Sequence, residues 1–164
     1  MVLDWRNKDG IREVSKNNNI ITDADHNKWI KKIDLKYLFL FKCRDKFIGV
    51  GQINKLDNST ACLSCYIGSD DAIPGSGAIL NLSIIKLAFE KFKIDYLYGE
   101  VLSNNQHALN MQTRLGFKMY DNLSRELFRE GENLIIYHLG MTAQKWMETR
   151  YKYENIFKRV KINI

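Results

Sequence analysis

The chain has 164 residues, of which 45% are hydrophobic, 27% are charged and only one is proline, and its formal net charge is +6. This length and hydrophobic share predict one globular domain, residues 1–164, and exclude a low-complexity or repeat protein. A positive charge suits nucleic acid, a membrane surface or a polyanionic small molecule, so charge alone does not choose among these partners.

No apolar run approaches the roughly 20 residues that a membrane-spanning helix needs, and the N-terminal residues show no signal-peptide pattern. We therefore expect a cytoplasmic protein with no membrane span. Cys62 and Cys65 have the spacing of half a zinc site, but residues three apart on a strand point to opposite faces, and no second Cys/His pair follows. We expect buried, reduced thiols and no metal.

The first third of the chain is predicted to hold short helices and a hairpin. Residues 2–7 have the pattern of a helix end, and Thr22 is a good N-cap for a helix over residues 22–33. Residues 37–41 and 47–53 are β-prone and flank a polar turn, which predicts two antiparallel strands.

A strand over residues 61–67 is followed by the turn Pro74-Gly75-Ser76-Gly77-Ala78 and by an amphipathic helix that reaches Phe92. Two glycines at a helix start let backbone N–H groups approach an anion, and the helix dipole favours negative charge there, so a phosphate is the expected guest. A tight turn with no ligand is the alternative that this motif alone leaves open.

A strand over residues 96–102 after this helix predicts a parallel strand pair with its crossover helix packed on the sheet. Asn105 caps a short helix that Gly116 ends, and strands follow at 117–120, 126–128 and 134–139. Residues 142–160 are expected to form one C-terminal amphipathic helix. The fold class is therefore α+β, with a mostly antiparallel sheet, one parallel pair and flanking helices.

Two motifs, correctly spaced around a strand, resemble those of the GCN5-related N-acetyltransferases over nearly the whole chain. Gly75-x-Gly77-Ala78 is similar to the family's pyrophosphate turn, and the run from Asn105 to Phe117 is similar to its second cofactor motif. The resemblance implies a twisted sheet, acetyl-CoA as cosubstrate, and these cofactor-binding residues: Tyr66, Ile67, Pro74, Gly75, Ser76, Gly77, Ala78, Asn105 and Gln112.

More narrowly, Trp5-Arg6-Asn7, the segment from Asp23 to Ile30 and Tyr66-Ile67-Gly68 resemble the acetyltransferases of UDP-4-amino-4,6-dideoxyhexoses in pseudaminic acid synthesis. This likeness implies an amino sugar nucleotide as substrate, with Arg6, Asn7 and His26 binding it. The chain departs from the family in four ways. The first strand is expected to be missing, Ala72 replaces a phosphate-side Gln/Arg, Cys62 replaces a strand carboxylate, and Gln112 replaces a tyrosine acid.

Glu100 and Gln112 are the candidate catalytic residues. A strand carboxylate among apolar neighbours has a raised pKa, which suits a base that takes a proton from the amine; a salt-bridged Glu100 with no catalytic role is the alternative. Gln112 falls on the same helix face as Asn105. Its amide can donate a hydrogen bond to sulfur but cannot give up a proton.

Two other functions remain open at this level. The acceptor could be a protein N-terminus or a polyamine, although a positive protein disfavours a polyamine. The chain could also be a catalytically weak CoA-binding protein, because two usual proton-transfer groups are replaced. Nucleic-acid binding is disfavoured, since the aromatic residues of the C-terminal segment have core spacing. A homodimer is an open alternative.

Overall fold

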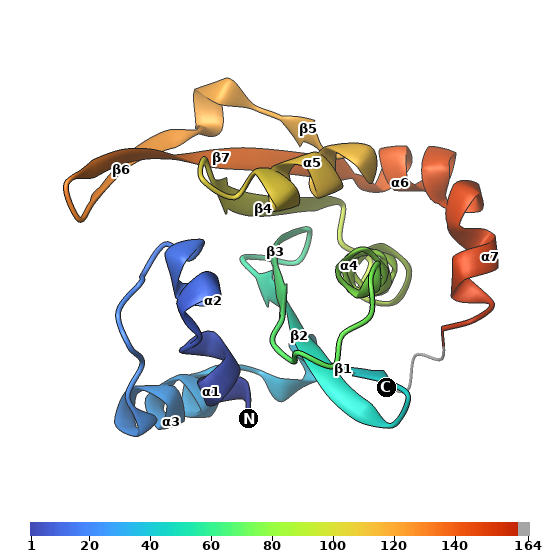
Figure 1. Cartoon of the computed structure of the whole chain (residues 1–164). Coiled ribbons are helices and arrows are strands. Elements are labelled where there is room, and N and C mark those ends of the chain that lie inside the picture. Colours follow the sequence, from blue (N-terminus) through green and yellow to red (C-terminus); the bar gives the residue numbers. More distant parts are fainter. Residues whose placement is uncertain (161–164) are drawn as a thin grey trace.

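The computed structural model describes residues 1–160 (Figure 1), and in this part of the chain seven strands form one mixed sheet. The strands are β1 (Leu38–Cys43), β2 (Lys46–Lys55), β3 (Thr60–Ile67), β4 (Tyr96–Leu102), β5 (Lys118–Met119), β6 (Arg125–Arg129) and β7 (Glu132–Thr142). Their order across the sheet is β1-β2-β3-β4-β7-β5, with β6 also paired to β7.

The strands are joined and flanked by helices of four to eleven residues and by other helical turns. The helices are α1 (Val2–Arg6), α2 (Asp9–Glu13), α3 (Asp23–Lys32), α4 (Ser76–Lys86), α5 (Gln106–Arg114), α6 (Ala143–Thr149) and α7 (Glu154–Phe157). Three 3₁₀ turns, Leu35–Tyr37, Asp121–Leu123 and Arg150–Tyr153, and a π-helical turn, Leu87–Lys91, complete the chain.

The predicted hairpin and capped helix are both confirmed. Arg44 and Asp45, which join β1 to β2, have φ values of 47° and 66°, the left-handed pair that a two-residue turn needs to match the twist of its strands. Thr22 accepts a hydrogen bond from the Asp25 backbone N–H at the start of α3. Local sequence chemistry is therefore enough to set these two elements.

The predicted strand, crossover helix and parallel strand are also confirmed. β3 pairs with β4 in parallel, and the other strand pairs run antiparallel. In Figure 1, α4 lies on one side of β1–β3 and α1–α3 lie on the other. The sheet is therefore covered on both faces near β3, and this sandwich holds the candidate site.

Alternation along the central strands separates the two faces. Leu97 and Val101 of β4 are buried in the same apolar core as Leu80 of α4 and Leu109 of α5. Successive side chains of a strand point to opposite faces, so Glu100 lies on the face that carries α1 and α2. In β3, Tyr66 donates a hydrogen bond to the Val2 carbonyl of α1, which places it on that same face.

The prediction of one helix over residues 142–160 is wrong. The segment is broken into α6, a 3₁₀ turn and α7 because it wraps around Trp146, which is fully buried. The Phe157 ring centroid lies 6.2 Å from that of Trp146. Eleven residues of straight α-helix would separate these positions by about 16 Å, so the contact requires the bend.

No helix within residues 1–160 is long and apolar enough to cross a membrane.

Candidate active site

The gap between β3 and β4 is the central feature of the site. The two strands pair from Thr60 opposite Tyr96 to Leu63 opposite Gly99, and no pair follows. Beyond this point, residues 64–67 pair only with β2 and residues 100–102 only with β7. One backbone edge of each strand is therefore left free over the described residues, and an extended ligand can bind there through main-chain hydrogen bonds.

A cavity of about 470 Å³ occupies this gap. Cys65 and Asn81 line it from the face of α4 and α5, whereas Ser64, Tyr66 and Glu100 line it from the face of α1 and α2. Because both faces contribute, the cavity passes between the two strands. A ligand that enters from the α4 side can therefore meet a second ligand that enters from the α1 side.

The N-terminus of α4 borders one end of this gap. Gly75, the residue before the helix, has φ of +88°, a conformation that glycine adopts without strain. A Cβ built on Gly77 would meet only Ile67 Cγ1, at 3.8 Å, so the space above this backbone is open. Eleven residues of helix and free N–H groups give an anion-binding end.

The other residues of the predicted phosphate turn differ in placement. Ser76 is 3% exposed and lines a separate groove between β1 and α4, so its side chain points away from the site. Its side chain does not fit the predicted contact, and its backbone N–H donates to the Ile73 carbonyl at 3.1 Å. Pro74 is exposed, and Ala78 is half-buried within the first turn of α4.

Asn105, the N-cap of α5, and Gln112 within this helix both line the cavity. The Asn105 side-chain oxygen accepts a hydrogen bond from the Ala108 N–H, so this residue also caps the helix. Gln112 is 6% exposed, and its Oε1 has no hydrogen-bond partner among residues 1–160. A Cβ on Gly99 would lie 2.8 Å from Gln112 Nε2, so the amide sits where β3 and β4 separate.

The structure contradicts the raised pKa that was expected for Glu100. Lys16 and Arg125 both donate hydrogen bonds to its carboxylate from opposite sides. The hydrogen bond from Arg125 is the largest influence, burial opposes it, and Lys16 adds to the lowering, which brings the pKa of Glu100 to about 2. A carboxylate this weakly basic does not suit proton abstraction from an ammonium group, so the ion pairs favour the salt-bridged alternative.

The ion pair between Glu100 and Lys16 is one of several contacts that hold residues 13–16, at the end of α2 and just after it. Arg129 of β6 donates to the backbone oxygens of Glu13 and Ser15, at 2.8 and 2.6 Å, and Asn104 donates to Glu13 at 3.2 Å. Residues 13–16 are thereby held over the cavity from β4, β6 and the start of α5. Glu100 links this segment to β4 through its ion pair with Lys16.

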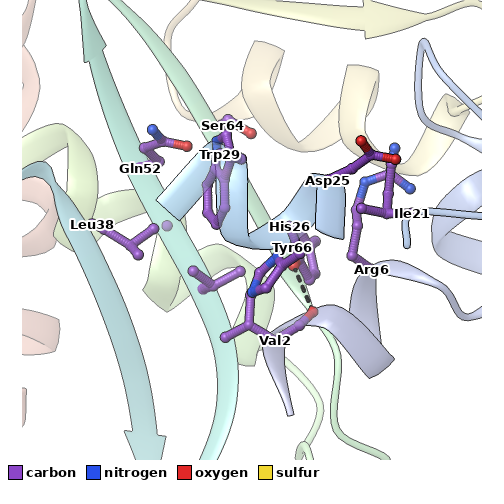
Figure 2. A pocket seen from close by; sticks show the side chains of 12 residues that line it. Val2, Arg6, Ile21, Asp25, His26, Trp29, Leu38, Gln52, Ser64 and Tyr66 are labelled. Carbon is purple, nitrogen blue, oxygen red and sulfur yellow. Dashed lines mark hydrogen bonds between the residues drawn. The ribbon is translucent and has the colours of Figure 1, made fainter. Parts of the chain in front are cut away.

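A second cavity of about 330 Å³ lies between the N-terminal helices and β1–β3 (Figure 2). His26 and Trp29 of α3 line it, and their rings are 5.3 Å apart between centroids. Arg6, Ser64 and Tyr66 line both this cavity and the one in the gap. The two cavities therefore meet at these three side chains, so a group bound in one is close to a group bound in the other.

Arg6 is the charged group at this junction. Its Nη2 donates to the Asn17 carbonyl at 2.6 Å, whereas its buried Nη1 has no partner among residues 1–160. No carboxylate of the described chain forms a salt bridge with it, and burial lowers the pKa of its guanidinium from the ordinary value. An arginine remains charged under such conditions, so Arg6 is prepared for an anionic ligand.

Asn7, predicted to contact the acceptor, lines neither cavity. Its Nδ2 donates to the Ile21 carbonyl at 2.9 Å, and its Oδ1 accepts from the Ile21 N–H at 2.8 Å. Both ends of the amide are thus used to hold the loop before α3. Asn7 positions that loop rather than contacting a ligand.

Trp5 explains how α1 brings Arg6 to the site. A Cβ on Gly68 would lie 2.2 to 2.4 Å from the nearest Trp5 atoms, so only glycine lets the indole approach the end of β3 so closely. Trp5 is 8% exposed in this contact. This packing fixes the backbone of α1, so the adjacent Arg6 is held next to the gap between β3 and β4.

Sequence reasoning missed Lys16 and Asn81. Lys16 pairs with Glu100 across 84 residues of chain, and nothing local marks it. Asn81 does carry a signal: it is a polar residue one turn after Gly77 on a helix whose neighbours are mostly apolar. No group of three or more His, Cys, Asp or Glu side chains with metal-binding geometry occurs in residues 1–160.

Comparison with protein families gives a match to the acetyltransferase (GNAT) domain over residues 2–135. Among curated proteins, an acetyltransferase named PseH from Campylobacter jejuni is 29% identical over 125 residues, which are 74% of this chain and 77% of that protein.

Solved structures share the fold at lower identity. The crystal structure of Vibrio cholerae spermidine N-acetyltransferase in complex with CoA and spermine superposes with a TM-score of 0.78 at 15% identity, covering 89% of this chain and 90% of that one. The crystal structure of Campylobacter jejuni N-acetyltransferase PseH gives 0.57 at 24% identity, over 73% of this chain and 78% of that one.

Proposed function

We propose, from the premise that this chain belongs to the acetyltransferase (GNAT) domain family, that it moves an acetyl group from acetyl-CoA to the 4-amino group of a UDP-linked 4-amino-4,6-dideoxyhexose. The observation that carries acetyl transfer is the gap after Leu63 and Gly99, whose cavity is lined from both faces of the sheet. A thioester and an amine can approach each other through this opening from opposite sides.

The free strand edges and the start of α4 fit CoA. The backbone of Ile67 on the free edge of β3 serves the pantetheine arm, and the open backbone around Gly75 and Gly77 serves the pyrophosphate. The backbone of Tyr66 faces β2, so Tyr66 contributes its side chain to the cavity. Gln112, at the point where the strands separate, donates to the sulfur. The pantetheine and pyrophosphate contacts use backbone groups, so neither of them depends on a particular side chain along β3.

The reaction forms a carbon–nitrogen bond and breaks the carbon–sulfur bond of the thioester. The acceptor amine must first lose its ammonium proton, and the departing thiolate must gain one. Glu100, with a pKa of about 2, does not take this proton. In this proposal water in the cavity accepts it. The second proton, which the nitrogen loses as the amide forms, passes through water to the thiolate, and Gln112 stabilises the thiolate by hydrogen bonding, because an amide cannot serve as an acid.

The acceptor assignment is supported by the second cavity. Arg6 offers an unpartnered Nη1 at the junction, which suits a diphosphate, and His26 and Trp29 offer a wall for the rest of the nucleotide sugar (Figure 2). The curated relatives named PseH are acetyltransferases, which supports the acetyl-transfer chemistry. A polyamine is disfavoured because its positive charges would face this buried guanidinium.

The test is mass spectrometry of three candidate amines, each incubated separately with the protein. The full chain is incubated with acetyl-CoA and either a UDP-4-amino-4,6-dideoxyhexose, a peptide with a free N-terminus, or spermidine. We expect one acetyl group to be added to the nucleotide sugar. Acetylation of the peptide or of spermidine, with the sugar untouched, would overturn the acceptor and keep the chemistry; CoA binding without turnover on any amine would leave only the cofactor site.

A further inference from the structure

We infer that Asn81 of α4 binds the pantetheine arm of CoA by accepting a hydrogen bond from one of its amide N–H groups. The inference rests on the proposed function, because it assigns a residue to the cosubstrate that this function requires. It adds a cofactor-positioning side chain that lies outside both of the sequence motifs described above.

Asn81 has an unused acceptor inside the cavity. Its side chain is 3% exposed and lines the cavity between β3 and β4. Its Oδ1 has no hydrogen-bond partner in the described part of the chain. A buried carbonyl oxygen without a donor costs free energy, and native proteins rarely leave one so unless water or a ligand supplies the donor.

The direction of this oxygen is fixed by the other end of the amide. Nδ2 donates to the Gly77 carbonyl at 2.9 Å and lies 3.7 Å from Met111 Sδ. Exchanging the two ends would place oxygen against the Gly77 oxygen, so the amide cannot turn to satisfy itself. The unused acceptor is thus a stable property of the cavity wall.

The position of Asn81 lies along the route that the arm must take. It is one helical turn, about 6 Å, from Gly77 at the phosphate end, and Met111 and Gln112 of α5 continue the same wall toward the point where the strands separate. The pantetheine arm carries two amide groups between the phosphates and the sulfur. An acceptor midway along the wall therefore suits one of their N–H groups.

The surroundings of Asn81 favour a neutral polar ligand. Burial raises the pKa of the neighbouring Cys65 thiol to about 12, and a hydrogen bond donated by the Asn81 amide N–H to the sulfur offsets part of the rise. That thiol is uncharged at neutral pH, and Met111 carries no charge. A neutral amide can be buried here at little cost if it is hydrogen-bonded. An ammonium or phosphate group would lose its hydration without gaining a counter-ion.

Ser83 provides a matched control on the same helix. It is 7% exposed and, like Asn81, donates to the carbonyl four residues earlier, Ile79, at 2.8 Å. It lines the separate groove between β1 and α4 rather than the site cavity. A purely helical role for such side chains would make the two positions behave alike.

The experiment is calorimetric titration of CoA into wild-type protein and into Asn81→Leu and Ser83→Ala variants. Adenosine 3′,5′-diphosphate, which has no pantetheine arm, is titrated in parallel, and the melting temperature of each unliganded variant is measured. We expect Asn81→Leu to weaken CoA about tenfold or more, to leave adenosine 3′,5′-diphosphate unchanged, and to keep or raise the melting temperature because an unsatisfied acceptor is removed. Ser83→Ala should leave both affinities unchanged.

An unchanged CoA affinity in Asn81→Leu would overturn the inference, as would an equal loss for both ligands. A lower melting temperature with unchanged CoA affinity would make Asn81 a structural residue. If the leucine variant does not fold, Asn81→Ala supplies the same measurements without added bulk against Met111. Failure of the wild-type protein to bind CoA would instead overturn the proposed function.

Discussion

The two halves of the site are built in different ways. On the cofactor side, the free edge of β3 and the starts of α4 and α5 present backbone groups, and each comes from one short segment of sequence. On the acceptor side, Arg6 is a single side chain whose setting depends on Asn17 and on Tyr66, far along the chain. The first half tolerates changes of side chain along the strand, whereas the second depends on individual residues.

The charges within the acceptor side sharpen this contrast. Arg6 has no carboxylate partner in residues 1–160 and keeps an unused donor, so it can serve a ligand. Glu100 has two cationic partners, Lys16 and Arg125, so both of its carboxylate oxygens already accept hydrogen bonds from the protein. A conspicuous charge in a cleft is therefore a binding or catalytic candidate only when its partners leave it free.

Of the substitutions considered, Gly77→Val should have the largest effect, and it should act on CoA binding at the start of α4. The structure has room for the new side chain, since the nearest atom to a Cβ is 3.8 Å away, so the fold should be kept while the approach of a phosphate is blocked. We expect CoA binding to weaken by at least about 3 kcal/mol, more than a hundredfold in Kd, as measured by calorimetry. Gly10→Val, at a glycine with nothing within 4 Å, is the control. Unchanged CoA affinity in a folded Gly77→Val protein would refute the phosphate site.

Arg6→Ala should damage the side-chain-built half alone. Loss of a charge-assisted contact to a diphosphate is worth about 1.5 to 3 kcal/mol, so the KM for the nucleotide sugar should rise ten- to a hundredfold while the KM for acetyl-CoA changes little. Steady-state kinetics check this. Lys8→Ala is the matched control, because Lys8 pairs with the exposed Asp70 and lines neither cavity. Equal rises in both KM values would mean that the two halves are not separable.

Gln112→Met should affect turnover more than binding. Methionine keeps the volume of the side chain but removes the amide that is proposed to stabilise the thiolate, so kcat should fall about tenfold or less. Because Gln112 Oε1 is buried without a partner, the free energy of unfolding should stay the same or rise. Complete loss of turnover with CoA affinity intact would assign Gln112 a larger role than an orienting amide.

Glu100→Gln should have the smallest effect on catalysis and a measurable effect on stability. The pKa of Glu100 is lowered from 4.5 to about 2, so its ion pairs stabilise the fold above about pH 4.5, and this contribution is lost as the pH falls toward 2. Lys16 and Arg125 are half exposed and screened by solvent, so we expect about 1 to 2 kcal/mol at neutral pH. Denaturant unfolding at several pH values measures this difference.

The difference in stability between wild type and Glu100→Gln should shrink as the pH falls through this range. Glu126→Gln, at an exposed position of β6, is the control for replacing a carboxylate by an amide. The kcat of Glu100→Gln should fall only a few-fold. A loss of several orders of magnitude, partly rescued at high pH, would restore Glu100 as the base.

The sequence predicted those parts of the molecule whose cause is local. The Thr22 and Asn105 caps, the β1–β2 turn and the Gly75 turn each depend on residues within a few positions of one another, and each occurs as predicted. The order of strand, crossover helix and strand likewise dictated the parallel pair. The backbone part of the proposed cofactor half follows from these elements, whereas the placement of the Asn81 and Gln112 side chains does not.

What only the tertiary structure decided are the contacts between segments that are distant in sequence. The pKa of Glu100 depends on Lys16 and Arg125, the role of Asn7 depends on Ile21, and the bend after α6 depends on packing around Trp146. The alternation of a strand shows on which face of the sheet a carboxylate such as that of Glu100 lies. It does not show which Lys or Arg side chains form ion pairs with it. Electrostatics and packing act through space, so the acceptor half of the site is set by the fold, whereas hydrogen bonding within a turn or a helix end is set by the sequence itself.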